Sequence, residues 1–220
     1  MRREISQEYH ALDTLADPLI ERFSDMRDIQ LAGAEADYVT VEDYLQIEEI
    51  SEERHEYVAG VLFAMAGGTK RHNRIISNLV RQMLDSADAI GCEVYSSDVK
   101  LRTASDVIYY PDIIVSCDPE DTNRQIVDRP CLVIEVLSPS TRRTDEREKL
   151  ISYRAIRGLQ AYIIVDQDMS RVIRHWWDSS SELWNTEIHI DGDIPVPCLH
   201  TLLPVEAIYR NLPGTDEPEE

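Results

Sequence analysis

The stretch CLVIEVL, Cys131–Leu137, decides how this chain folds. Six of its seven residues are apolar, and Glu135 is the exception. A nearly continuous apolar run of this length is typical of a strand that is buried on both faces of a sheet. A second such run, AYIIVD at 161–166, predicts another buried strand. Between them, residues 145–157 predict a helix that the following glycine ends.

The flanking segments predict further strands and helices around these two strands. Apolar residues recur every three or four positions over 72–87, which predicts an amphipathic helix. The remaining elements that we expect are a short helix at 40–49, a strand pair at 55–65 that turns at Gly60, strands at 93–101 and 107–116, a hairpin at 171–190 and a closing segment at 201–209. Pro111 predicts an edge position, a bend or a bulge within 107–116. This order describes an α/β (α+β) protein, a mixed sheet with helices packed on it.

Length and composition predict one domain of the chain's 220 residues, over 38–210. Residues 1–37 are polar and acidic and read as a flexible extension, and 211–220 as a disordered acidic tail. The sequence has no apolar run long enough to span a membrane and no pattern like that of a signal peptide, so we expect a cytoplasmic protein. The four cysteines are widely spaced without a C-x-x-C pair, which favours reduced thiols in the core over a zinc site.

The net charge of −20 is a poor electrostatic match for nucleic acid. Two stretches reverse the sign, however: basic residues have no acidic neighbours within 70–81, and they outnumber the acids within 142–157. Such runs usually form a solvated helix face. They would also permit contacts to a nucleic-acid backbone, so both interpretations stay open.

Glu135 is the strongest indication of a functional site. An unpaired carboxylate in a buried strand costs several kcal/mol, so it must be protonated, ion-paired or bound to a metal. Asp112 follows Pro111 and alone would be an ordinary turn acid. If residue 112 pairs with 135 across antiparallel strands, 115 pairs with 132 and the loop centres on the polar segment 118–130.

Two carboxylates on adjacent strands, about 4.8 Å apart, could share one cation. Oxygen ligands suit Mg²⁺ or Mn²⁺, and the backbone carbonyl of Val136 could add a third oxygen. Lys149 recurs at helical spacing between Asp145 and Tyr153 and so shares a face with them. It could reach the metal to orient water or hold a phosphate; a surface salt bridge with Asp145 explains its spacing equally well.

These motifs together resemble the Uma-type restriction endonuclease family, a group of unknown function within the PD-(D/E)XK nuclease superfamily. The resemblance covers about residues 38–190 and is carried by PD at 111–112, EVLSPST from 135, D-x-x-x-K-x-x-x-Y at 145–153 and YIIVD at 162–166. It extends to TVEDYL near 40, RHEYVAG at 54–60, GGTKRHNRI at 67–75 and SDVKLR at 97–102.

The resemblance implies a restriction-endonuclease-like αβββαβ core, here with additional C-terminal strands, and Mg²⁺-dependent hydrolysis of DNA phosphodiesters, with Mn²⁺ as a substitute. Asp112 and Glu135 would be the metal ligands. The superfamily's lysine position is occupied by Leu137, so Lys149 would replace that lysine. Glu56 is our choice for an additional acid from an earlier element, with Asp98 and His72 as weaker candidates.

Two other function classes stay open on the sequence alone. The net charge and the leucine at the lysine position favour a binding or regulatory module that keeps the fold without cleaving. An acidic surface that mimics nucleic acid for a basic partner is a third hypothesis. A homodimer would supply the two sites that cutting both strands of a duplex requires, although no residue specifies one.

Overall fold

The structure, a computed structural model, describes residues 38–137 and 144–213, with the side chains of residues 144–146 left out. The predicted extension at 1–37 and residues 214–220 of the predicted tail therefore lie outside the described residues. From Val39 onward the described chain forms one compact unit. None of its helices is long and apolar enough to cross a membrane.

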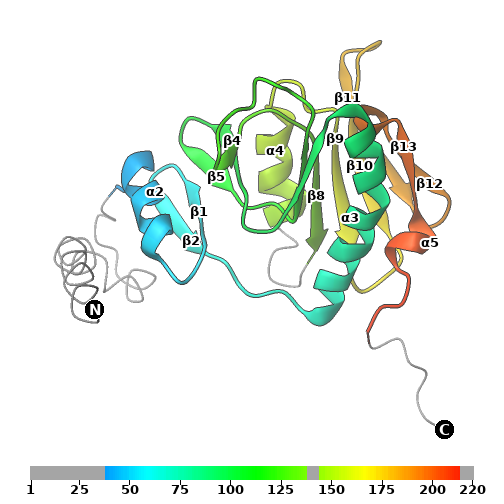
Figure 1. The fold of residues 1–220 in the computed structure, drawn as a ribbon, viewed down its shortest axis with the longest axis horizontal. Helices are drawn as coiled ribbons and strands as arrows, with labels where there is room; N and C mark the ends of the chain where they lie inside the picture. The colour runs from blue at the N-terminus through cyan, green and yellow to red at the C-terminus, as the bar shows by residue number, and fades with distance from the viewer. Residues whose placement is uncertain (1–37, 138–143, 214–220) are drawn as a thin grey trace, which may run out of the picture. The chain divides into compact units, whose positions relative to one another are not determined.

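A six-stranded sheet in the order β11-β10-β9-β8-β6-β3 is the centre of the molecule (Figure 1). Every residue of β8 (Pro130–Leu137) and of β9 (Ala161–Asp166) is buried, and the two strands run parallel, which confirms both predicted buried strands. The predicted hairpin is also confirmed, as β10 (Val172–Asp178) paired antiparallel with β11 (Leu183–His189).

Strand β6 (Ile113–Ser116) lies between β8 and β3 (Glu93–Ser96) and is antiparallel to both. Its register on β8 pairs Val115 with Leu132, as the sequence predicts, and shifts only after Val115. This register places residue 112, just before β6, beside residue 135.

The two predicted strands 93–101 and 107–116 each divide between two sheets, which corrects the prediction of one mixed sheet. The chain leaves β3 through Ser97 and Asp98, both with positive φ, before β4 (Lys100–Ala104). It leaves β5 (Val107–Tyr109) through Pro111 before β6. Because a proline donates no ladder hydrogen bond, it is a favourable place for such a bend.

Strands β4 and β5 belong to a five-stranded sheet in the order β2-β1-β5-β4-β7. The predicted strand pair appears there as β1 (His55–Val58) and β2 (Val61–Ala64), joined by Ala59 and Gly60 with φ of 48° and 88°. Two positive φ values are what a two-residue hairpin turn requires. Strand β7 (Ile126–Val127) was not predicted, because two residues inside a polar segment give no periodic signal.

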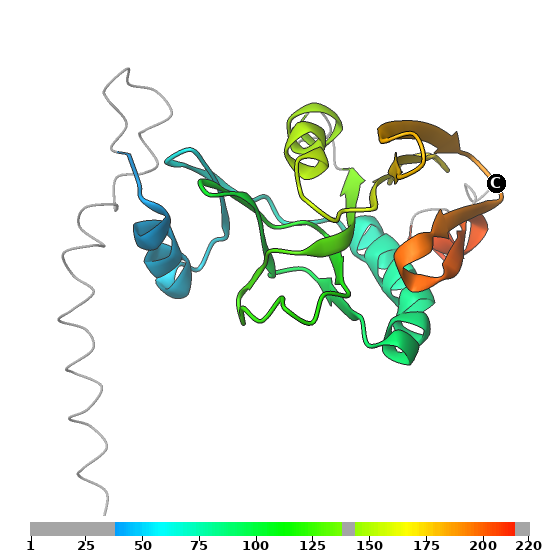
Figure 2. The same cartoon turned by 90° about the horizontal axis from the view of Figure 1, so that it is seen from above.

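Two helices cover opposite faces of the six-stranded sheet (Figure 2). Helix α3 (Lys70–Ile90) begins at the N-cap Thr69 and packs its apolar stripe on the face that presents Ile134. A π-helical turn η1 (Thr144–Lys149) leads into α4 (Leu150–Arg154), whose Tyr153 packs on the other face. This helix ends three residues before the predicted end at 157.

The remaining elements close the two ends of the unit. Helix α2 (Val41–Ile50) is capped by Thr40, as predicted, and contacts β1. The predicted closing segment, 201–209, forms β13 (Thr201–Pro204) and α5 (Val205–Ile208). Before it lie β12 (Asp193–Val196) and η2 (Pro197–Leu199), which were not predicted, and all four elements join α3 in one apolar core. In sequence, α3-β3-β6-β8-α4-β9 reproduces the αβββαβ order, with additional C-terminal strands as expected.

The cysteines overturn one expectation. The structure joins Cys92 to Cys117 and Cys131 to Cys198 in disulfides, in place of the predicted reduced thiols. The paired cysteines are 25 and 67 residues apart in the sequence. The pairing could not be predicted, because distance along the chain does not measure distance in the folded protein.

Candidate metal centre

Asp112 and Glu135 meet where β6 begins and β8 nears its end. The amide of Val136 donates a hydrogen bond to Asp112 Oδ2 at 2.7 Å, and the amide of Asp112 approaches Glu135 Oε2 at 3.4 Å. Each carboxylate therefore contacts the backbone of the strand that carries the other. The structure brings together the two acids that the strand register predicts.

The buried carboxylate of Glu135 receives two further donors from the helical segment after β8. Lys149 Nζ lies 2.9 Å from Glu135 Oε1, and the Tyr153 hydroxyl donates to the same oxygen at 2.8 Å. Lys149 and Tyr153 are four residues apart, so the helix presents them on one face, as predicted. The third residue of that predicted face is Asp145, whose side chain is not among those that the structure describes.

Lys149 also connects the two sheets. Its ammonium lies 2.8 Å from Glu56 Oε1, and Glu56 belongs to β1 of the five-stranded sheet. The lysine side chain is only 5% exposed, so both ion pairs are shielded from water. Leu137, at the superfamily's lysine position, is packed in the apolar core beside α4, and Lys149 brings the amine to Glu135 instead.

His72, a weaker candidate on the sequence, contacts the site directly. Its Nε2 lies 3.2 Å from Asp112 Oδ2. The histidine is held in the first turn of α3, where its amide donates to the Thr69 side chain at 3.0 Å. A Cβ at Gly68 would approach His72 Nδ1 to 2.9 Å, so glycine leaves room for the ring. The T-x-x-H spacing signals the cap, but only the fold shows the proximity to Asp112.

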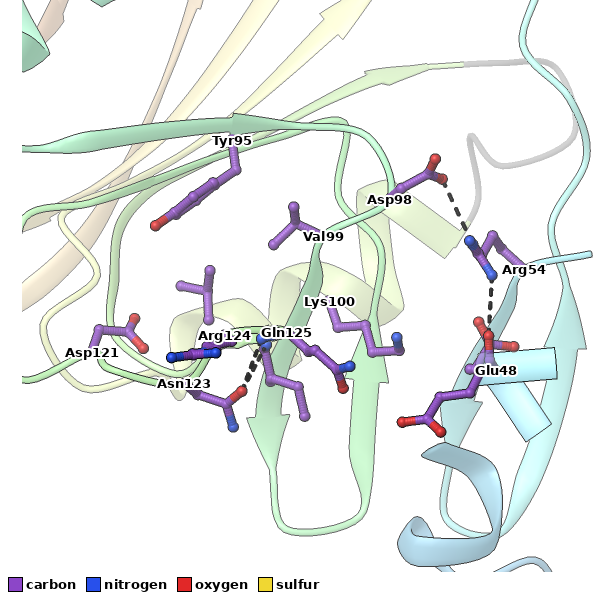
Figure 3. A pocket seen from close by; sticks show the side chains of 13 residues that line it. Glu48, Arg54, Tyr95, Asp98, Val99, Lys100, Asp121, Asn123, Arg124 and Gln125 are labelled. Carbon is purple, nitrogen blue, oxygen red and sulfur yellow. Dashed lines mark hydrogen bonds and ion pairs between the residues drawn. The ribbon is translucent and has the colours of Figure 1, made fainter. Parts of the chain in front are cut away.

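Asp98, the other weaker candidate, lies elsewhere. Its side chain is 75% exposed and sits 3.9 Å from Arg54 Nε. Figure 3 shows both residues in a pocket of about 420 Å³ beside Lys100, Glu48 and the 121–127 loop. The pocket is lined by groups of both charges, and neither Asp112 nor Glu135 lines it. The structure gives Asp98 no place in the carboxylate cluster.

The electrostatics of the cluster are dominated by buried negative charge. Within the described residues, three carboxylates meet one lysine and one histidine. Burial and the neighbouring Glu135 raise the pKa of Tyr153 well above its ordinary value, so this tyrosine remains a protonated donor. The ion pair of Glu135 with Lys149 is one of the three arrangements expected for a buried glutamate. Carboxylate oxygens are hard donors, which suit Mg²⁺ or Mn²⁺.

The two basic stretches differ in what they expose. On α3, Lys70 and Arg74 are exposed beside His72, and Arg81 is exposed further along the helix. In the second stretch, Arg147 and Arg157 are exposed, whereas Lys149 is buried in the carboxylate cluster. Arg142 and Arg143 lie outside the described residues. The α3 stretch thus begins next to the site, whereas the second stretch contributes its lysine to the site itself.

Comparison with known families identifies the class of protein. The family model Uma2, described as "Putative restriction endonuclease", matches residues 41–199, which is most of the chain. The chain belongs to this family, in agreement with the resemblance in its motifs. Family membership supports a nuclease-like function of the hydrolase class.

Particular relatives agree with this assignment. Two uncharacterized proteins of Synechocystis sp. are each 33% identical, slr1290 over 78% of this chain and 91% of its own length, and sll1609 over 66% and 84%. A crystal structure described as a putative nuclease belonging to DUF820 from Anabaena variabilis superposes with a TM-score of 0.63. It covers 78% of this chain and 97% of its own at 20% identity, a level at which the similarity supports the fold alone.

Proposed function

We propose that this protein is a Mg²⁺-dependent endonuclease that hydrolyses phosphodiester bonds of DNA. The observation that carries the proposal is the position of Glu135, which shares the buried ammonium of Lys149 with Glu56 and lies against Asp112 where β6 begins. Neighbouring carboxylates repel one another, and a divalent ion between them would remove that repulsion.

In this proposal Asp112, Glu135 and Glu56 hold the metal, and the carbonyl of Val136 adds an oxygen ligand. The bound metal would lower the pKa of a water molecule and screen the charge of the phosphate. Lys149 orients the attacking water or stabilises the phosphoryl oxygens. Tyr153 fixes Glu135, and His72 fixes Asp112, each through the contact described above.

The exposed basic residues at the start of α3 would contact the phosphate backbone. Lys70 and Arg74 are exposed at the same end of α3 that carries His72. Such contacts would be sensitive to salt, because binding releases condensed counterions. They would position DNA without reading its sequence, since phosphates carry no sequence information.

The test is cleavage of plasmid and single-stranded DNA with Mg²⁺ or Mn²⁺ by wild type, Asp112→Asn and Glu135→Gln. Glu206→Gln is a matched control, because Glu206 is an exposed glutamate on α5. Loss of metal-ion catalysis is worth several kcal/mol, or about 10²- to 10³-fold in rate. We expect that loss in both site variants and full activity in the control. Equal activity in all four proteins, or activity that survives a chelator, would exclude the proposal.

A second candidate is a binding module that keeps the nuclease fold without cleaving. Leu137 at the superfamily's lysine position favours it, together with the net charge of −20. Calorimetric titration with Mg²⁺ separates the two candidates. Binding that disappears in Glu135→Gln supports the nuclease, and DNA binding without any Mg²⁺ binding supports the module.

A further inference from the structure

All four cysteines of the chain converge on one place. They come from four separate segments: Cys92 follows α3, Cys117 follows β6, Cys131 lies on β8 and Cys198 lies in η2. The sulfurs of Cys117, Cys131 and Cys198 all lie within 4.8 Å of one another, and Cys92 is bonded to Cys117. Three sulfur atoms thus form one cluster, and Cys92 is joined to that cluster by its bond to Cys117.

The distance between the two disulfides distinguishes this arrangement from two separate disulfides. Two independent disulfides need proximity only within each pair, yet Cys117 Sγ lies 3.6 Å from Cys131 Sγ. In a tetrahedral zinc site with Zn–S bonds of about 2.3 Å, neighbouring sulfurs lie roughly 3.8 Å apart. The spacing between the pairs therefore matches an edge of such a tetrahedron.

The surroundings suit a structural metal site. Cys92 and Cys131 are buried and Cys117 and Cys198 partly buried, and all four pack in the apolar core under α3. An ion would thus be enclosed on one side and reachable on the other. Thiolate ligands select soft or borderline metals such as zinc over Mg²⁺, so this cluster and the carboxylate cluster would not compete for the same ion.

We propose that these four cysteines form a zinc-binding centre that becomes available when the two disulfides are reduced. Two molecules of a dithiol reductant break the two S–S bonds: each supplies two electrons and two protons and is oxidised to a disulfide, and the protein is left with four thiols. Zn²⁺ then displaces the four thiol protons and is held by four thiolates. The ion would connect the end of α3, β6, β8 and η2, the same segments that the disulfides connect.

The experiment is a Co²⁺ titration of the protein after anaerobic reduction, compared with the oxidised protein. We expect one thiolate-bound Co²⁺ per reduced chain, with sulfur-to-cobalt charge-transfer absorption and the visible bands of tetrahedral Co²⁺, and displacement by Zn²⁺. The oxidised protein should show none of these bands. A reduced wild type without thiolate–cobalt absorption would overturn the proposal. This comparison uses the wild-type chain alone, so it does not depend on whether a variant folds.

Two variants locate the site. Cys198→Ser removes one ligand and should weaken Co²⁺ binding at least about tenfold, since even an outer-shell partner contributes 10- to 100-fold to metal affinity. Glu135→Gln, which alters only the carboxylate cluster, should leave the thiolate bands unchanged. Bands that persist with undiminished affinity in Cys198→Ser, or vanish in Glu135→Gln, contradict a site at the cysteines. Neither result bears on the nuclease proposal, which is tested by cleavage.

Discussion

The strand pair β6–β8 ends in carboxylates on one side and in cysteines on the other. Asp112 precedes β6 and Glu135 lies near the end of β8, whereas Cys117 follows β6 and Cys131 lies near the start of β8. Asp112 and Cys117, on either side of β6, are five positions apart in the sequence, or roughly 16 Å of extended chain. One pair of strands thus positions hard oxygen ligands and soft sulfur ligands at places too far apart to share an ion.

The two ends differ in how their polar atoms are stabilised. At the carboxylate end, buried charges require a lysine, a tyrosine hydroxyl and backbone amides around them. At the cysteine end, sulfur atoms in disulfides carry no charge and pack in the apolar core without such donors. The carboxylate end is therefore stabilised by the balance of opposite charges, and the cysteine end by covalent bonds.

The largest effect should follow removal of the buried ammonium by Lys149→Met. Breaking a buried ion pair by deleting one partner costs about 3–5 kcal/mol, because the remaining charges are uncompensated. We expect a loss of that size in the free energy of unfolding, measured with a denaturant. If the carboxylates bind a divalent ion, Mg²⁺ should recover part of the loss.

Lys70→Met is the matched control, because Lys70 is exposed at the start of α3. It should change the free energy of unfolding little and show no recovery with Mg²⁺. A Lys149→Met protein as stable as the control would show that the carboxylate end does not depend on charge balance.

The next effect should appear at the cysteine end, in the oxidised protein. Loops of 25 and 67 residues give an entropic stabilisation of about 3.5 kcal/mol for Cys92–Cys117 and about 4.4 kcal/mol for Cys131–Cys198. The double variant Cys131→Ala/Cys198→Ala should therefore lose slightly more unfolding free energy than Cys92→Ala/Cys117→Ala. Thermal and denaturant unfolding measure both. No loss in either variant would mean that covalent connection does not stabilise this end.

A smaller effect that depends on pH is expected for Tyr153→Phe. A hydrogen bond to a buried charged group contributes about 1.5–3 kcal/mol. Burial raises the pKa of Tyr153 above the ordinary value of 10.0, so in alkali the unfolded chain loses the proton before the folded one. The stability that Tyr153 contributes to the folded state is therefore fully present below about pH 10 and is lost as the pH rises further.

Denaturant unfolding from about pH 8 to about pH 11 should therefore show a smaller alkaline loss of stability in Tyr153→Phe than in wild type. Parallel pH profiles for the two proteins would contradict the assigned pKa shift.

The smallest effect on stability should come from His72→Gln. His72 contacts Asp112 at 3.2 Å, and a typical intramolecular hydrogen bond contributes only about 0.5–1.5 kcal/mol to stability. If Asp112 is a metal ligand, however, the loss of a partner that orients it should weaken Mn²⁺ binding by about 10- to 100-fold. Calorimetry measures the affinity, and unchanged Mn²⁺ binding would remove His72 from the metal centre.

Much of the carboxylate end could be predicted from the sequence, because the length of the loop between two antiparallel strands determines which of their residues pair. The apolar run around Glu135 indicates a buried strand, and the loop length fixes the register that brings Asp112 beside it. The helical spacing of Lys149 and Tyr153 shows that they share a face. The sequence could not show that Lys149 also reaches Glu56, because that contact joins two sheets that the prediction had merged into one.

The buried strands, the amphipathic helix, the register of β6 on β8 and the family could all be predicted from the sequence. They depend on the spacing of apolar residues, on the length of the loop between two strands and on short motifs, which the order of amino acids shows directly. The tertiary structure was needed to show how the sheets divide, that His72 contacts Asp112 and that three distant cysteines form one cluster to which Cys92 is bonded. These features depend on where the chain bends and how separate segments pack, and packing distances between remote residues leave no periodic trace in the order of amino acids.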